Sequence, residues 1–512
     1  MKAIRTLIMI SMGLLFAFSS VKAQDLPRDL ALLFSRTNTG GSARIIGLGG
    51  VNTSLGGDIS SVSTNPAGLG FYNRSEISFT PSININSNST SYLGTSGSST
   101  FTKFHMGNLG VVINNSKPDR IPGGWRGGSF GFSYNRINDF NREVVYSGTN
   151  TENDYLDFLL DLARVNNAEL GDFYQVDMAY YTYLLNDFDI DPGTGDTLAG
   201  WGTFVEAPTP DTPVNQSERI VTSGSQNKWD FSYGGNFGDR FYFGIGLGIV
   251  TVKYENEKYY REDRYPESIL NHYNLFERQV VDGVGVNGNF GIIVRPITTL
   301  TVGINYTTPT AYSFTDDFQT SLNSIWNPSA NDFYGDDPNF TGDHFEENFL
   351  NPLTYTINTP MRLNVGASYF FNKNGFISGD IEWVDYSKAK IRSNDGDFSL
   401  DNQEIAGMYR SVINYRLGGE YRMGIFRFRA GFNFQADPIN EESNLNRAVQ
   451  TYSAGLGLRK KSFYTDFGYL YSTTEGSRAP YIIDPSLEIG PTPVADINYS
   501  QHRLVFSFGF LF

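Results

Sequence analysis

Strict alternation of apolar and polar residues is the strongest pattern along this chain. Between Tyr409 and Arg422, apolar side chains such as Ile413 and Leu417 alternate with charged and amide side chains. From Phe426 onward the parity reverses, with phenylalanines at even positions and polar residues or glycine at odd ones. Side chains of a β-strand point alternately to opposite faces. Each segment therefore predicts a strand with one apolar face and one polar face, as in the wall of a transmembrane β-barrel.

The same alternation predicts fourteen strands, an even number as expected for a single-chain bacterial barrel. They span 75–91, 100–114, 127–147, 219–236, 240–257, 277–295, 298–315, 353–371, 375–392, 408–422, 425–437, 448–460, 462–474 and 497–512. Short and long connections alternate, and the two main long loops are expected at 148–218 and 316–352. We therefore predict an all-β protein, a 14-stranded antiparallel transmembrane barrel over 75–512, with both termini in the periplasm.

Composition supports one barrel over several soluble domains. The chain has 512 residues, with 31 Tyr, 40 Phe, 54 Gly and no Cys. Aromatic residues suit strands and membrane girdles, whereas glycine suits tight turns and crowded lumen positions. The absence of cysteine excludes disulfide frameworks and thiol chemistry. A formal net charge of -15 argues against a nucleic-acid partner, because phosphate binding needs the opposite sign.

Residues 1–23 have the layout of a secretory signal peptide. Lys2 and Arg5 precede an apolar run, and Val21-Lys22-Ala23 provides a small-residue cleavage site, so the mature chain is expected to begin near Gln24. No later run of about 18 apolar residues predicts a transmembrane helix. A chain with this pattern crosses a membrane as a closed barrel, in which every backbone group is paired. The expected location is the outer membrane of a Gram-negative cell.

The segment between the signal peptide and the first strand, 24–74, is expected to fold inside the barrel. Its main part, 40–74, is rich in Gly, Ser, Thr and Asn and carries small apolar residues at intervals. That composition is too polar to build its own core. The segment needs a host, and the lumen is the simplest one, so we predict a plug.

Several motifs in this segment resemble the FadL-type outer-membrane transporters of long-chain fatty acids and other hydrophobic compounds. The matching motifs are Ala43-Arg44, Gly47-Leu48-Gly49-Gly50, Asp58 and Asn65-Pro66-Ala67-Gly68-Leu69. The resemblance is specific over 40–74 and only architectural elsewhere. It implies an N-terminal hatch that blocks a 14-stranded barrel, with gating residues Asn65, Pro66, Ala67, Gly68, Gly47, Gly49 and Gly50. Asn-Pro also marks ordinary turns, which is the alternative interpretation of that dipeptide.

Two long loops carry candidate substrate-binding residues. Around 154–164, helical spacing places Leu156 and Leu159 on one apolar face. The loop 316–352 combines aromatic residues, among them Phe318 and Trp326, with eight acidic residues and no Lys or Arg. The resemblance implies that such loops form a hydrophobic groove in which substrate first lands. The alternative is that the loops pack on each other as a cap, and both arrangements are compatible.

Arginines on the lumen-facing parity are further candidates. Arg362 and Arg416 could hold a substrate carboxylate, because a guanidinium offers a matching bidentate fork. They could equally pair across the lumen with acids such as Asp380 or Glu382.

The remaining chemistry indicates a non-enzyme. The four histidines lie on separate segments without metal-ligand spacing, and no Gly-x-Ser-x-Gly motif occurs, so we expect no metal, no cofactor and no catalytic residues. The predicted function is passive uptake of hydrophobic, long-chain fatty acid-like molecules by a monomer embedded in outer-membrane lipid. Large acidic, aromatic loops also suit protein docking. The alternative function is therefore a secretion-system component that binds secreted proteins at its external loops.

Overall fold

One antiparallel sheet closes on itself to form the body of the molecule. The computed structural model describes residues 27–38, 40–116, 124–165, 168–190, 197–335, 337–394, 396–440 and 445–512. The signal peptide expected at 1–23 lies outside these residues. Strand β1 pairs with β2 on one side and with β20 on the other, which joins the first and last strands and closes the ring.

The described residues of the main sheet form eighteen strand segments, which build fourteen wall strands. Four wall strands are interrupted, each made of two consecutive segments: β3 with β4, β10 with β11, β12 with β13, and β14 with β15. The segments are β1 (Glu76–Tyr92), β2 (Thr95–Ser116), β3 (Trp125–Asp139), β4 (Arg142–Asn150), β7 (Val214–Phe237), β8 (Phe241–Asp263), β9 (Leu270–Ile297), β10 (Leu300–Thr307), β11 (Ala311–Trp326), β12 (Asp343–Asn358), β13 (Arg362–Phe370), β14 (Gly375–Asp385), β15 (Lys390–Arg392), β16 (Ser411–Met423), β17 (Phe426–Gln435), β18 (Val449–Arg459), β19 (Phe463–Arg478) and β20 (Ala495–Leu511). The predicted fold class is confirmed.

The two faces of the wall follow the predicted parity. In β8, Phe241, Phe243, Ile245 and Leu247 are exposed on the outside, whereas the residues between them are buried toward the lumen. Buried inward positions elsewhere in the ring are rich in asparagine, serine and threonine. Apolar residues outside and polar residues inside are the reverse of the distribution in a soluble protein. A wall between lipid and a filled polar lumen requires this distribution.

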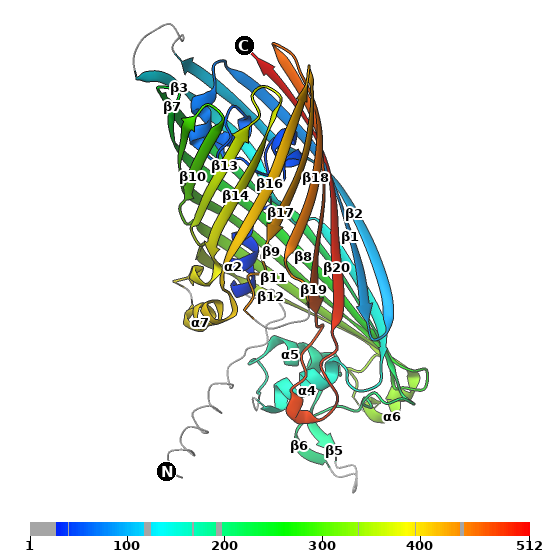
Figure 1. Cartoon of the computed structure of the whole chain (residues 1–512). Helices are drawn as coiled ribbons and strands as arrows, with labels where there is room; N and C mark the ends of the chain where they lie inside the picture. The colour runs from blue at the N-terminus through cyan, green and yellow to red at the C-terminus, as the bar shows by residue number, and fades with distance from the viewer. Residues whose placement is uncertain are drawn as a thin grey trace, which may run out of the picture.

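The two ends of the barrel differ strongly (Figure 1). Short turns and the C-terminus lie at one end, which we assign to the periplasm. The other, external end carries a cap of helices and a small hairpin: α4 (Tyr155–Val165), α5 (Tyr174–Tyr181), β5 (Asn186–Ile190), β6 (Thr197–Gly202), η3 (Pro328–Ala330), α6 (Asn331–Tyr334) and η5 (Pro485–Leu487). Nearer the wall on this side lie η4 (Tyr386–Lys388) and α7 (Ser399–Met408). No helix in the described part of the chain is long and apolar enough to span a bilayer.

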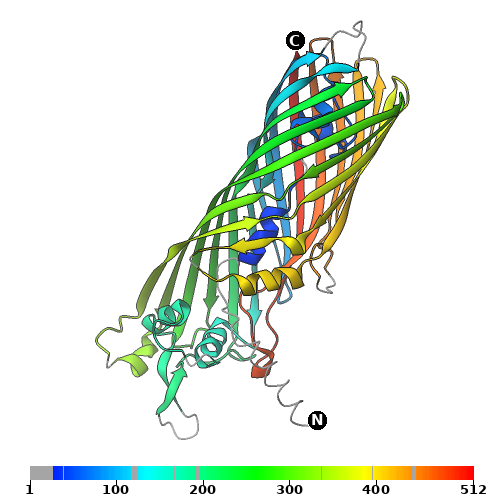
Figure 2. The ribbon, with the colours of Figure 1, turned by 90° about the vertical axis from the view of Figure 1, so that its left-hand side faces the viewer.

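The expectation of one continuous loop over 316–352 is wrong at both ends. Strand β11 continues to Trp326 and β12 begins at Asp343, so the connection is much shorter. The acidic and amide residues in these arms are typical of loops, but β9 pairs with β11 as far as Trp326 and fixes it as strand. The long strands β7, β8, β9, β11 and β12 therefore project beyond the rest of the wall on the external side (Figure 2).

The N-terminal segment lies inside the ring (Figures 1 and 2). It contains α2 (Pro27–Ser35) toward the external end and, toward the periplasmic end, α3 (Ala43–Gly47), η1 (Ile59–Val62) and η2 (Pro66–Phe71). We call residues 40–74 the plug. Nearly all of its residues from Gly41 to Gly70 are buried, although the stretch is short of large apolar side chains.

The wall has a break between β3 and β4. Strand β2 pairs with β3 only from Asn108 onward, and beyond this point β4 lies against the β1–β2 hairpin without a described backbone ladder to β2. Side chains replace the ladder. Thr90 Oγ1 donates to the Val145 carbonyl at 2.8 Å, and Asn88 donates to the Glu143 carbonyl. Side-chain contacts of this kind hold the break closed.

Candidate functional site

The Asn-Pro-Ala segment of the plug is pinned to the wall. Asn65 caps η2, because its Oδ1 accepts from the Ala67 N–H at 3.1 Å. Its Nδ2 donates to the Thr53 carbonyl at 2.6 Å and faces the Ile304 carbonyl on β10 at 3.4 Å. Pro66 occupies the first helical position, where a missing N–H costs nothing. This one side chain thus joins the turn, the rest of the plug and the wall.

Glycines of the wall make room for this segment. A Cβ on Gly244 of β8 would lie 2.2 Å from the carbonyl carbon of Pro66, and one on Gly291 of β9 would lie 1.8 Å from Asn65 Oδ1. Any other residue at either position would collide with the plug. The plug and the wall are therefore matched at the level of backbone contact.

The glycines predicted for the hatch also allow close backbone contacts, at other points of the plug. Gly49 has φ +70°, a conformation that favours glycine, and its Cβ would lie 2.7 Å from the Phe432 backbone. Gly50 also has a positive φ, and Gly47 lies against Gly455 of β18. Gly68 packs against Ser61 inside the plug itself.

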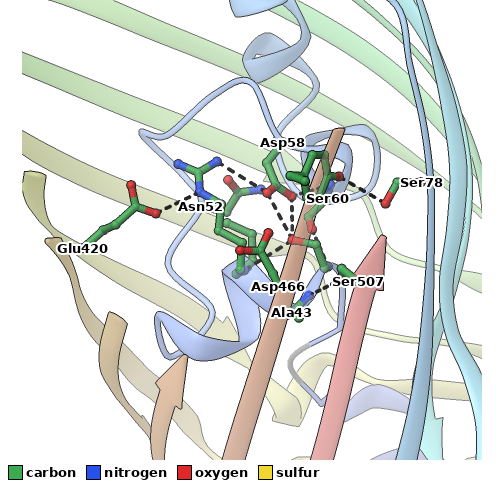
Figure 3. A network of polar contacts seen from close by, with 12 residues as sticks. Ala43, Asn52, Asp58, Ser60, Ser78, Glu420, Asp466 and Ser507 are labelled. Carbon is green, nitrogen blue, oxygen red and sulfur yellow. Dashed lines mark hydrogen bonds and ion pairs between the residues drawn. The ribbon is translucent and has the colours of Figure 1, made fainter. Parts of the chain in front are cut away.

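A buried ion network ties the plug to the opposite wall (Figure 3). Arg44 of α3 lies 3.4 Å from Asp58 in the plug and 3.4 Å from Glu420 of β16. Glu420 also pairs with Arg429 of β17 at 2.8 Å, and Arg429 reaches Asp466 of β19 at 2.6 Å. Charges buried this deeply are stable only when each one keeps its partner. The network therefore holds the plug in one position.

A second anchor uses a single carboxylate. Asp380 Oδ2 accepts from the backbone N–H groups of Asn52 and Thr53 at 2.9 and 3.0 Å, and from Thr53 Oγ1 at 2.9 Å. Asp380 was expected to pair with a lumen arginine. Instead it holds the plug backbone, because two adjacent N–H groups point at it.

A cavity of about 170 Å³ lies between the plug and α2. Most of its lining residues are polar, and they include asparagines from several strands, with Asn135, Asn287 and Asn305 among them. Arg362 and Arg416 both border it, and each pairs with Glu382 at 3.2 Å. Their charge is thus shared with a carboxylate inside the protein. Of the two interpretations, this geometry matches pairing with an inward acid, although Glu382 lies on β14, the wall strand between Arg362 on β13 and Arg416 on β16, and not across the lumen.

An apolar band lies on the external side of this cavity. We call it the collar, and it is formed by inward side chains of the wall together with Phe140 at the break: Val250, Val252, Tyr254, Val281, Tyr312, Phe314, Tyr355, Ile357, Val384, Ile391 and Val412. Helix α2 fills it, with Leu30, Ala31 and Phe34 almost fully buried against the collar. The apolar part of the lumen is therefore occupied by the chain's own N-terminal helix.

Three of the four predicted apolar loop residues lie in the core of the external cap. Leu156 and Leu159 of α4 share one buried cluster with Trp326 of β11, and none of them exposes more than 6% of its surface. Phe318 is also buried, beside Tyr174 of α5. The arrangement matches the cap alternative, and these side chains present no open groove here.

Carboxyl groups of the cap are buried as well. Asp154 and Asp157 accept hydrogen bonds from each other's backbone N–H groups, and Arg264 pairs with Asp154 at 2.5 Å. Burial, with the nearby Asp154 carboxylate, raises the pKa of Asp157 to about 7. The first turn of α4 is thus sensitive to pH near neutrality.

Sequence reasoning missed the collar and its occupant. The signal was present, because Leu30, Ala31 and Phe34 have helical spacing and follow Pro27, a favoured first residue of a helix. In the described part of the chain, no group of three or more potential ligand residues is arranged to hold a metal ion.

Comparisons with known proteins identify the fold. The sequence matches no protein-family model and no curated protein. Among solved structures, a FadL homologue of Pseudomonas aeruginosa superposes with a TM-score of 0.54 at 12% identity, covering 93% of this chain and 99% of that one. The toluene transporter TodX of Pseudomonas putida gives a TM-score of 0.51 at 13% identity, with coverage of 93% and 99%. The chain has the fold of the FadL-type outer-membrane channels.

Proposed function

We propose that this protein is a passive outer-membrane channel for hydrophobic small molecules, with single-chain, fatty acid-like compounds as the substrate class. The observation that carries this proposal is the collar, an apolar band of the lumen that borders the polar cavity. Burying alkyl surface there is favourable by about 25 cal/mol per Å². A polar solute would gain nothing from the same surface.

Helix α2 is the internal competitor for the collar. Its apolar face is small and packs on Ile405 of α7 as well as on the collar. Tyr409 and Gln226 also donate hydrogen bonds to the Arg28 and Phe34 carbonyls, both at 3.2 Å. An ion pair joins Arg28 to Glu404, in which Arg28 is a quarter exposed and Glu404 about half exposed. An exposed pair of this kind contributes little stability. An incoming alkyl chain replaces one apolar contact with another, so displacing α2 carries a modest net cost.

The plug is proposed to act as the hatch, with Asn65, Pro66 and Ala67 as its moving part. Only a few hydrogen bonds hold this segment to the wall, whereas Arg44 and Asp380 anchor the other side of the plug. Movement of the Asn65 segment alone would open a path without expelling the whole plug. Direction is set only by the concentration gradient, because differential affinity between states cannot drive net transport.

The similar structures support the same class. One is called a FadL homologue and the other a toluene transporter. At 12–13% identity, these names support hydrophobic transport without choosing between an alkyl and an aromatic substrate. The alternative of a cargo-docking secretion component gains no support from them.

Uptake in cells tests the proposal. The gene is expressed in a Gram-negative host that lacks its own fatty-acid channel, and entry of radiolabelled oleate, toluene and a sugar is measured. We expect faster entry of oleate than in the empty host, with no increase for the sugar. A V252Q/V281Q variant that makes the collar polar should lose this gain. Equal oleate entry with and without the protein, once heat-modifiable folded barrel is seen on gels, would refute the proposal.

A further inference from the structure

A second concave site lies at the periplasmic mouth, on the periplasmic side of the plug. It has a volume of about 1000 Å³ and lies between the end of the plug and two periplasmic turns. We call it the basin. The plug contributes Phe71, Tyr72 and Arg74, and the β16–β17 and β18–β19 hairpins contribute Arg427, Lys460 and Phe463. Neither the collar nor the polar cavity shares these residues.

The basin concentrates positive charge on an acidic protein. Five cations line it, against one carboxylate, the buried Glu76: Arg74, Arg427, Arg459, Lys460 and Lys461. Over the described residues, none of the five pairs with a carboxylate within 4.0 Å, in contrast to Arg44, Arg362, Arg416 and Arg429 in the lumen. The external end of the barrel concentrates negative charge instead, because residues 316–352 include eight acidic residues and no Lys or Arg.

Backbone and ring contacts hold these cations in place. Arg74 donates to the Lys461 carbonyl at 2.8 Å, and Arg427 donates to the Gly424 and Phe426 carbonyls at 2.8 and 2.7 Å. Such contacts position the guanidinium groups without neutralising them. The basin therefore carries an excess of positive charge over the one carboxylate in its lining, which favours binding of an anion.

Apolar side chains complete the lining. Phe463 and Ile425 are 38% and 43% exposed, and Leu511 and Phe71 lie in the same wall. Lys460 lies over the Phe463 ring, with its nitrogen 5.3 Å from the ring centroid. Charge and aromatic surface are thus adjacent. A concave, half-apolar site of this size fits a small amphiphile better than the flat face of a protein.

We propose that the basin binds the anionic head group of a single-chain amphiphile, a carboxylate or a phosphate, with its alkyl chain against Ile425 and Phe463. Lysine and arginine form charge-assisted hydrogen bonds with such oxyanions. The ligand comes either from cargo that leaves the lumen or from the inner leaflet of the membrane. The proposal depends on the basin lining alone and holds whether or not the protein transports fatty acids.

A label at Ser462, a basin residue, gives a local readout because the chain has no cysteine. S462C carrying an environment-sensitive fluorophore is placed in nanodiscs of zwitterionic lipid and titrated with decanoate, decyl phosphate, inorganic phosphate and decyltrimethylammonium. We expect saturable shifts with decanoate and decyl phosphate, a much weaker response to inorganic phosphate, and none with the cationic amphiphile.

Matched variants locate the binding. K460Q/K461Q should weaken decanoate binding about tenfold or more, as expected for lost hydrogen bonds to a charged group. R240Q/K373Q removes two exposed cations from other turns of the same rim and should leave the affinity unchanged. Equal affinity of the labelled parent and K460Q/K461Q would overturn the proposal, as would equal binding of decanoate and decyltrimethylammonium.

Nanodiscs that contain phosphatidylglycerol separate the two sources of the ligand. If membrane lipid occupies the basin, the apparent affinity for decanoate should fall in these discs. If only a released amphiphile enters it, the affinity should stay the same. The measurement reports equilibrium binding, so a failure of uptake in cells would not change it, and loss of binding would leave the uptake result intact.

Discussion

Phe34 of α2 stacks on Phe314 of the barrel wall, with ring centroids 4.8 Å apart and planes inclined by 23°. Phe34 also meets Phe140 and Tyr254 edge to face. The N-terminal helix thus occupies the position that an alkyl or aromatic ligand would need. Under the proposed function, release of α2 from the collar is the first internal step of transport.

Tethering α2 should therefore stop uptake. In the cysteine-free chain, R28C/E404C is joined by a cleavable bismaleimide, which links α2 to α7 where the native ion pair lies. We expect oleate entry to fall to the level of the empty host and to recover when the linker is cleaved. Each single-cysteine variant with the same reagent serves as control. Undiminished uptake through the tethered protein would show that α2 need not move.

The ion network predicts a plug that loosens when one partner is removed. Glu420→Gln leaves Arg44 and Arg429 short of a buried partner, a change that costs about 3–5 kcal/mol. We expect a lower thermal unfolding temperature and a higher single-channel conductance. Asp239→Asn removes a half-exposed partner of Arg126 and should cost less than about 1 kcal/mol. Similar conductance in both variants would show that the network does not hold the plug.

The wall glycines predict a steric effect at the Asn-Pro-Ala segment. Gly244→Ala introduces a Cβ that collides with the Pro66 carbonyl, and overpacking of this kind costs about 1–3 kcal/mol. The displaced segment should admit small sugars in a liposome swelling assay. Gly379→Ala is the matched control, because its Cβ would meet its nearest neighbour at an ordinary 3.7 Å. Unaltered swelling with Gly244→Ala would contradict the assigned contact.

The external cap should be more stable in mild acid. The folded pKa of Asp157, about 7, lies above that of a carboxyl in the unfolded chain, so the folded cap binds the proton more tightly. Stability is greatest below the unfolded pKa and is lost as pH rises through about 7. Hydrogen exchange of α4 should therefore be slower at pH 5 than at pH 8, after correction for intrinsic rates. Asp157→Asn should flatten this dependence, and an unchanged profile in the variant would assign the effect to another group.

The wall could be predicted from sequence because its two faces meet opposite solvents. Phe241 and Phe243 face lipid, whereas Gly244 and Gly246 face a filled lumen, so alternation persists where packing in a soluble core would blur it. The plug motif was also visible, because backbone contact with the wall demands glycine at positions such as Gly49.

Other features could not be predicted because they depend on which strands are neighbours in the wall and on how far each pairing extends. Arg362 and Arg416 come from different wall strands and converge on Glu382, and no spacing along the chain indicates that choice. The part of β11 from Asp316 to Trp326 has the sequence of an acidic loop, and only its pairing with β9 identifies it as a strand. The position of α2 depends on a collar whose residues are drawn from seven strand segments and the break.

Photocrosslinking of a fatty acid tests the central claim most directly. A long-chain acid with a diazirine on its alkyl chain is bound to the purified protein, irradiated and mapped by mass spectrometry. We predict labelling of collar residues on β8 and β11, such as Tyr254 and Phe314, that is suppressed by excess oleate and by the α2 tether. Labelling confined to outward residues such as Ile245 and Leu247, and unaffected by either treatment, would contradict transport through the collar.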